Sequence, residues 1–175
     1  MRLPLPFASP TAATLPDPAA YERFHPFLRG VFSQWHVTPF LVDGARFNTA
    51  EQWMMAGKAV LFGDAERAAA IMATDDPAEQ KRLGQLVAGF DTATWDSHKV
   101  AIVFRGNVEK FSQNAGARRH LIATAGAMLV EANPRDWIWG CGLAEDDPGI
   151  STPTAWRGEN LLGRILTLVR DSPTG

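Results

Sequence analysis

The chain has 175 residues, which is the size of one domain and enough to bury a hydrophobic core without disulfides or a structural metal. Apolar residues make up 46% of the sequence, which argues against disorder, and the net charge of −2 gives no basic surplus typical of a dedicated nucleic-acid-binding protein. The single cysteine, Cys141, excludes an internal disulfide, and the four histidines show no metal-ligand spacing, so we expect no metal site.

The N-terminal region lacks a continuous apolar signal core, and no stretch reaches the ~20 apolar residues that span a bilayer. We therefore expect a cytoplasmic protein with no membrane partner. Residues 1–20 are rich in proline, alanine and threonine, and because proline fixes φ and lacks an N–H, we predict an irregular, partly mobile arm there. The folded domain is predicted over residues 21–175. The prolines of the arm are Pro4, Pro6, Pro10, Pro16 and Pro18.

The first elements are predicted in the segment 32–47, which has strand character. Residues 40–42 and 45–47 flank the turn Asp43-Gly44, a pattern typical of a short β-hairpin. Thr49, followed three residues later by Gln52, fits a capping box, so a helix is predicted to begin here and run to about Phe62.

Later elements are mostly helical. Helices are predicted over 64–72, 77–88, much of 94–129 with a break near Gly116, and 160–170, where the apolar residues follow a helical spacing. Short strands are predicted at 129–131 and 137–139, with a loop over 140–153. The sequence thus predicts an α+β fold: a helix-rich single domain with a small β-sheet or hairpin. Neither GxGxxG nor GxxxxGK[ST] occurs, so the usual dinucleotide and P-loop phosphate sites are absent.

The predicted helix after Thr49 carries the first candidate for chemistry. Glu51 lies in its opening turn, where free backbone amides and the helix dipole favour an anion, whereas burial would raise the pKa of the carboxyl. Lys58 lies on about the same face, roughly 10 Å further along the axis, and could flank one ligand with Glu51. The alternative is an exposed helix with a solvated glutamate and lysine.

The six tryptophans are many for this length. Trp35, Trp139 and Trp156 occupy predicted loop or strand-end positions, where an indole can stack on a base, although core packing is the favoured interpretation for any single tryptophan. Trp53 and Trp95 are predicted to lie in the core.

The loop that begins at Trp139 combines glycines with acids. Gly140 permits close backbone approach to a ligand, and Asp146 or Asp147 could supply a second carboxylate or only shape a turn. Arg157, near the start of the last helix, could bind a phosphate together with free amides, or form a surface ion pair. Cys141 has no adjacent histidine or lysine and is not expected to act as a nucleophile.

Four segments in order, from about Gly30 to Arg170, together resemble the NADAR (YbiA-like) family, which assigns residues 21–175 to a NADAR domain. This resemblance implies hydrolysis of N-glycosidic bonds. The substrate would be a ribosylamino-pyrimidine phosphate of the early riboflavin pathway, or nucleic acid from whose guanine ADP-ribose is removed. A non-catalytic ADP-ribose or nucleotide-binding module is the third possibility. The segments are FSQWHVTPFLVDGARFNTAEQWMMAGKAVLFGD, KFSQN, LVEANPRDWIWGCGL and WRGENLLGRIL.

The resemblance also implies roles for residues. Glu51 matches the acidic residue of the family's helix motif, and Lys58 matches the lysine that ends it. Two departures are Gln52, where many members have histidine, and Cys141, where some have aspartate; a second carboxylate would then come from Asp146 or Asp147. The implied substrate-binding residues are Phe32, Ser33, Trp35, Trp139, Gly140, Arg157 and Asn160.

These matches predict a mechanism without a metal or organic cofactor. Glu51 would stabilise the positive charge that develops at C1′ and activate water, while Trp35 and Trp139 line the base. Lys58 and Arg157 would neutralise phosphate. The proton donor is left open among Asp146, Asp147, Lys58 and a water molecule, and Lys58 could instead form a Schiff base with ring-opened ribose. The predicted partner is a small nucleotide-like substrate, with nucleic acid only as an ADP-ribosylated substrate.

Overall fold

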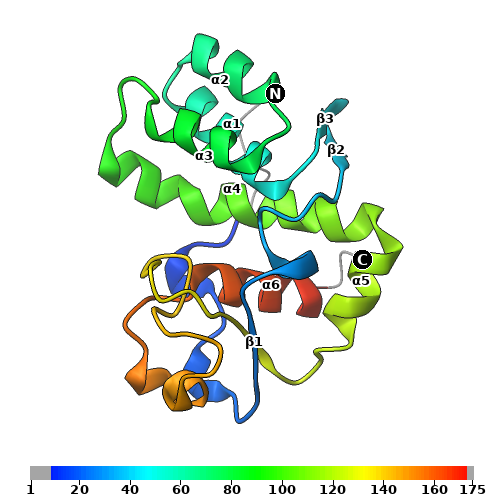
Figure 1. Cartoon of the computed structure of the whole chain (residues 1–175), viewed down its shortest axis with the longest axis vertical. Helices are drawn as coiled ribbons and strands as arrows, with labels where there is room; N and C mark the ends of the chain where they lie inside the picture. The colour runs from blue at the N-terminus through cyan, green and yellow to red at the C-terminus, as the bar shows by residue number, and fades with distance from the viewer. Residues whose placement is uncertain (1–8, 173–175) are drawn as a thin grey trace.

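The computed structural model describes residues 9–172 and shows a helix-rich α+β domain divided by one long helix. Helix α4 (Thr92–Gln113) crosses the molecule (Figure 1). On one side lie α1 (Ala50–Leu61), α2 (Ala65–Met72), α3 (Pro77–Gln85) and the hairpin of β2 (Phe40–Val42) and β3 (Ala45–Phe47). On the other lie α5 (Ala115–Ile122), α6 (Leu161–Asp171) and β1 (Phe24–Phe27), which pairs in parallel with β4 (Met128–Glu131). The predicted fold class is confirmed.

Local sequence signals explain the helix starts. The side chain of Thr49 accepts a hydrogen bond from the Gln52 amide, which caps α1 as predicted, although the Gln52 side chain bonds the amide of Asn48 rather than that of Thr49. Asp64 caps α2 in the same way by accepting from the Arg67 amide. The helical segment that follows Asp91 breaks at Asn114, close to the predicted Gly116. The β2–β3 hairpin forms around Asp43-Gly44, as predicted.

The predicted strand at 137–139 is wrong. Asp136 Oδ1 accepts hydrogen bonds from the amides of Ile138 and Trp139, at 3.0 and 2.8 Å, so this segment forms a side-chain-stabilised turn in place of a strand ladder. The pairing of β1 with β4 was not predicted. Strand β1 has only four residues and contains Pro26, so its sequence gives almost no strand signal.

The described part of the N-terminal arm lies against α6. Arg164 donates to the carbonyl oxygens of Pro16 and Ala12, and Leu15 is buried. Residues 1–8 of the predicted arm lie outside the described residues, and the domain start at residue 21 stays a prediction. Among residues 9–172, no helix is long and apolar enough to cross a membrane.

The core consists of two clusters that β4 separates. Leu129 packs into the main cluster, which lies between α1, α4 and α6, whereas Met128 and Val130 face a second cluster beneath the 140–150 loop. This alternation follows from the two-residue period of a strand, whose side chains point to opposite faces. Side chains of β4 therefore pack into both core clusters, which holds the strand between them.

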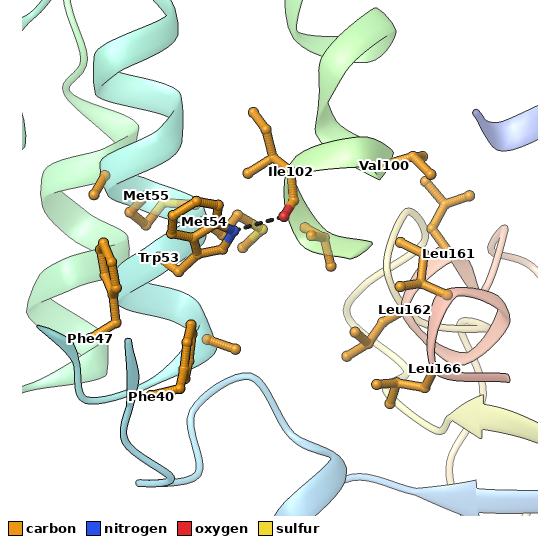
Figure 2. Close-up of a cluster of buried hydrophobic side chains, with 14 of the residues drawn as sticks. Phe40, Phe47, Trp53, Met54, Met55, Val100, Ile102, Leu161, Leu162 and Leu166 are labelled. Carbon is orange, nitrogen blue, oxygen red and sulfur yellow. Dashed lines mark hydrogen bonds between the residues drawn. The ribbon is translucent and has the colours of Figure 1, made fainter. Parts of the chain in front are cut away.

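The predicted core position of Trp53 is confirmed. Its side chain is buried between the hairpin and α4, and its indole N–H donates to the carbonyl of Ile102 at 2.7 Å (Figure 2). Trp95, also predicted in the core, is only partly buried and packs against its margin. Gly106 lies against the face of the Trp53 indole, since a Cβ there would overlap the indole ring.

We expect Gly106→Ala to lower the free energy of unfolding by about 1–3 kcal/mol, because the added methyl group overpacks a rigid site. Urea unfolding followed by circular dichroism measures this change. Gly116→Ala is the matched control, since its Cβ would meet only the end of the Arg119 side chain, 3.9 Å away. Equal unfolding midpoints for the two variants would contradict this packing.

Candidate active site

Glu51 lies in the first turn of α1 and is almost fully buried, with 3% of its surface exposed. Its amide donates to the Gln34 carbonyl at 3.0 Å, and its Oε1 has no hydrogen-bond partner in the described structure. Burial raises the pKa of the Glu51 carboxyl to about 7; the charge of Lys81 and a hydrogen bond from the Trp35 side chain act in the opposite direction, and Asp136 raises it further. An unsolvated acid therefore occupies this helix start.

A second acid, Glu131, is partly buried and belongs to the same electrostatic cluster. It ends β4, and its Oε2 also has no hydrogen-bond partner in the part of the chain that the structure describes. Burial raises the pKa of Glu131 to about 8, and the charges of Asp136 and Glu51 add to this effect, while Lys81 lowers it. A charge on Glu51 therefore opposes the ionisation of Glu131, because two negative charges in one site repel each other.

The sequence analysis missed Glu131 as a site residue, although it stands in the family-like segment LVEANPRDWIWGCGL. The available signal was an acid that directly follows three apolar strand residues. That signal indicates the end of a strand, but it does not show which charged side chains from other parts of the chain lie near the acid.

Trp35 and Lys81 form the solvent side of this cluster. Trp35 is 43% exposed, and the Lys81 ammonium lies 5.9 Å from the centre of its indole ring. Lys81 comes from α3 and Trp35 from the turn after residues 30–32, so two separate parts of the chain meet above Glu51. An exposed indole next to a cation provides a surface for a flat ring and a negative group.

The turn that carries Trp35 is supported from below. The ammonium of Lys110, fully buried on α4, donates to the Ser33 carbonyl at 3.0 Å, and burial lowers the pKa of Lys110 to about 7. Ser33 Oγ in turn accepts from the Trp35 amide. Ser33, predicted as a ligand contact, therefore uses its backbone and hydroxyl oxygens to shape the turn.

Unpartnered buried polar atoms extend beyond the two acids. The Asn107 amide group donates to Gln34 Oε1 at 3.1 Å, which leaves Gln34 Nε2 and Asn107 Oδ1 without partners. Buried polar atoms rarely stay unpaired in folded proteins because each costs about 1–3 kcal/mol. A set comprising Gln34, Glu51, Asn107 and Glu131, with both donors and acceptors, is the arrangement expected of a ligand site.

Asn160 fixes the position of Glu131. Its Oδ1 accepts from the Glu131 amide and its Nδ2 donates to the Leu129 carbonyl, both at 2.9 Å. The residue is fully buried and adopts a left-handed conformation with φ of 50°. The side chain predicted to bind substrate is thus engaged with β4 and acts as a positioning residue.

Lys58 lies apart from this cluster. Its ammonium donates to the Gly84 carbonyl at 2.9 Å and lies 4.3 Å from the centre of the Phe90 ring, and burial lowers its pKa. The charges that act on Glu51 are those of Lys81 and Asp136, not that of Lys58. Roles for Lys58 as a phosphate ligand or Schiff-base amine stay predictions.

The two predicted aspartates occupy a loop at the surface. Asp147 Oδ1 accepts from the Gly149 amide at 2.8 Å and caps the short helical turn Pro148–Ser151, which agrees with the turn interpretation. Asp146 is exposed. Neither aspartate is among the charges that act on Glu51 or Glu131.

Trp139, Gly140 and Arg157 are further predicted ligand contacts. Trp139 is partly buried against the main core. A Cβ on Gly140 would lie 2.8 Å from the Asp136 carbonyl and 3.0 Å from that of Glu131, so glycine here allows the loop to close on itself. Arg157 is exposed, and its amide bonds the Cys141 carbonyl.

A separate surface groove of about 930 Å³ lies between β1 and the start of α5. Phe32, predicted as a ligand contact, is buried beside Phe27 and lines this groove together with His36 and Arg29. Glu51 and Glu131 do not line it.

Comparison with known proteins agrees with this geometry. A family model described as NADAR domain matches residues 23–172. The chain is 40% identical over 146 residues to N-glycosidase R617 of Acanthamoeba polyphaga mimivirus, with 81% of this chain and 86% of the relative covered. It is 30% identical over 142 residues to N-glycosidase YbiA of Escherichia coli (strain K12), with 81% and 80% covered. The NMR structure of E. coli YbiA matches with a TM-score of 0.71 at 28% identity, over 86% of this chain and 84% of that chain.

Lys81→Met should raise the pKa of both buried glutamates, because the Lys81 charge lowers both. A pH titration of the side-chain carboxyl carbons by NMR measures the two shifts. Lys58→Met is the matched control and should leave the Glu51 pKa unchanged. A Glu51 pKa that stays the same in Lys81→Met would show that the two groups do not interact.

Asn160→Ala should lower the free energy of unfolding by about 2–5 kcal/mol, because it leaves the Leu129 carbonyl and the Glu131 amide buried without partners. Chemical denaturation of the variant and of Asn133→Ala tests this. Asn133 Oδ1 accepts from the Arg135 amide in an exposed turn, so its loss should cost much less. Similar losses in the two variants would refute the assigned role of Asn160.

Proposed function

We propose, since the chain belongs to the NADAR-domain family and is a hydrolase of N-glycosyl bonds, that it cleaves the C1′–N bond of a ribosylamino-pyrimidine 5′-phosphate or a related nucleotide. We assign Glu51 as the carboxylate that faces the anomeric carbon, C1′. Two relatives named N-glycosidases support the reaction class. The observation that carries the residue assignment is the unpartnered, buried oxygen of Glu51 beside an exposed indole.

The chemistry needs one negative charge in a dry site. When the C1′–N bond breaks, positive charge spreads over C1′ and the ring oxygen, and a nearby carboxylate stabilises it far better in a low-dielectric pocket than in water. The first turn of α1 favours the ionised form of Glu51, and its Oε1 keeps an unused hydrogen-bonding position. The same carboxylate can then accept a proton from the attacking water.

The surroundings of Glu51 suit a small nucleotide. The exposed face of Trp35 can stack on a pyrimidine, and Lys81, close to that ring, can neutralise a phosphate. Lys81 thereby joins Arg157 and Lys58 as a candidate phosphate ligand. Asp146 and Asp147, on the surface loop, stay alternative candidates for the proton donor. The alternative substrate is nucleic acid with ADP-ribose attached to guanine. The net charge of −2 gives the protein no general attraction to such a polyanion.

Glu51→Gln should lower kcat by about 10²–10⁴-fold while substrate still binds, because the amide keeps the shape but not the charge. Release of ribose 5-phosphate from a ribosylaminopyrimidine phosphate, and of ADP-ribose from ADP-ribosylated DNA, identifies the substrate. Binding by calorimetry separates a catalytic role from a binding module. Glu66→Gln, an exposed acid on α2, is the matched control and should behave like wild type. Full activity of Glu51→Gln would remove this carboxylate from the mechanism.

A further inference from the structure

We propose that Glu131 is the second catalytic carboxyl of this enzyme and delivers a proton to the departing nitrogen. This inference rests on the proposed function, in which Glu51 faces the anomeric carbon. It names the proton donor, a role that the sequence pattern left open among Asp146, Asp147, Lys58 and water.

The main chain holds Glu131 rigidly. Its amide donates to Asn160 Oδ1 at 2.9 Å, and its carbonyl accepts from the amides of Cys141 and Asn133 at 2.9 and 3.0 Å. With its backbone fixed at three points, the side chain leaves the end of β4 in a defined direction. Its Oε2 is buried and has no hydrogen-bond partner in the described structure, so this carboxyl keeps an unused hydrogen-bonding position.

Shared neighbours place Glu131 and Glu51 in one site. Lys81 and Asp136 act on both carboxyls, and the charge of Glu51 acts on Glu131. The two acids come from opposite halves of the molecule, one from the start of α1 and the other from the end of β4 (Figure 1). A substrate that reaches both would lie between the helical layer above α4 and the loop that follows β4.

The surroundings assign different proton states to the two acids. The Glu131 carboxyl, with a pKa of about 8, holds its proton at neutral pH longer than Glu51, whose pKa is about 7. Because a charge on Glu51 disfavours a second charge on Glu131, the pair favours a state that carries one proton. Two acids whose environments separate their pKa values form the usual basis for dividing acid and carboxylate roles.

The reaction balances with this assignment. The electron pair of the C1′–N bond goes to nitrogen, and the Glu131 proton forms the new N–H bond. Water adds to C1′ through its oxygen and loses a proton to the Glu51 carboxylate. The products are the sugar with a C1′ hydroxyl and the free base, and transfer of one proton from Glu51 to Glu131 through solvent restores the starting state.

The other side-chain candidates are committed elsewhere, apart from Asp146, which is exposed on the surface loop. Asp147 caps a turn, and Lys58 donates to the Gly84 carbonyl. Asp136, though close, uses Oδ1 to accept two loop amides. Glu131 differs from these three because its Oε2 is a buried oxygen that has no hydrogen-bond partner in the described structure.

The test compares leaving groups that do and do not need a proton. On a ribosylaminopyrimidine 5′-phosphate, Glu131→Gln should lose about 10²–10⁴-fold in kcat, as expected for removal of a general acid. On p-nitrophenyl ribofuranoside 5-phosphate, whose phenolate departs without protonation, the same variant should stay within about threefold of wild type, whereas Glu51→Gln should lose activity on both substrates. Activity on the phenyl glycoside also shows that the variant is folded.

The pH profile gives an independent readout. For wild type, kcat/KM on the aminopyrimidine substrate should fall above about pH 8 as Glu131 ionises, and this decline should be absent from the residual activity of Glu131→Gln. Glu66→Gln serves as the control and should keep the wild-type profile. Full activity of Glu131→Gln on the aminopyrimidine, or equal losses on both substrates, would overturn the role of Glu131. Loss of the proposed function itself would appear differently, as an inactive wild type or an active Glu51→Gln.

Discussion

The hydrogen bonds from the Asn160 side chain to β4 are the constraint on which both the core and the site depend. They occupy the strand's free edge, bonding Leu129 and Glu131 where a further strand would otherwise pair. Immediately after Asn160, α6 begins and approaches so closely that a Cβ on Gly163 would overlap the Leu129 carbonyl. The same contact thus sets the division of the core at Leu129 and the direction in which Glu131 leaves the strand.

Polar atoms in the candidate site destabilise the fold that this core stabilises. One oxygen of each of the two carboxyls, the Gln34 amide nitrogen and the Asn107 amide oxygen are buried without partners in the described structure, and each such atom costs about 1–3 kcal/mol. Packing around Trp53 and the leucines of α6 must offset that cost (Figure 2). Such unpaired groups are typical of positions that a fold retains for chemistry, since a ligand that bonds them recovers much of the lost free energy.

Signals within a few residues of one another predicted most of the fold. The Asp-Gly turn, the Thr49 cap and the spacing of α6 are local, and the structure confirms the hairpin and helices that they indicate. The β1–β4 pairing joins segments about 100 residues apart, and neither four-residue strand shows a period. Glu131 was missed for the same reason: its burial and its neighbours Glu51 and Lys81 are produced by tertiary contacts that no spacing in the sequence encodes.

The two acids differ in the hydrogen-bond donors that the fold gives each of them. Glu51 stands at a helix start, where the backbone dipole favours an anion, and it receives a hydrogen bond from Trp35. Glu131 stands at a strand end, where its own amide is already used by Asn160, so no nearby backbone donor compensates the burial of its charge. The helix start and the strand end thus give the two acids different environments, and such a difference can separate the acid and carboxylate roles that bond cleavage with proton transfer requires.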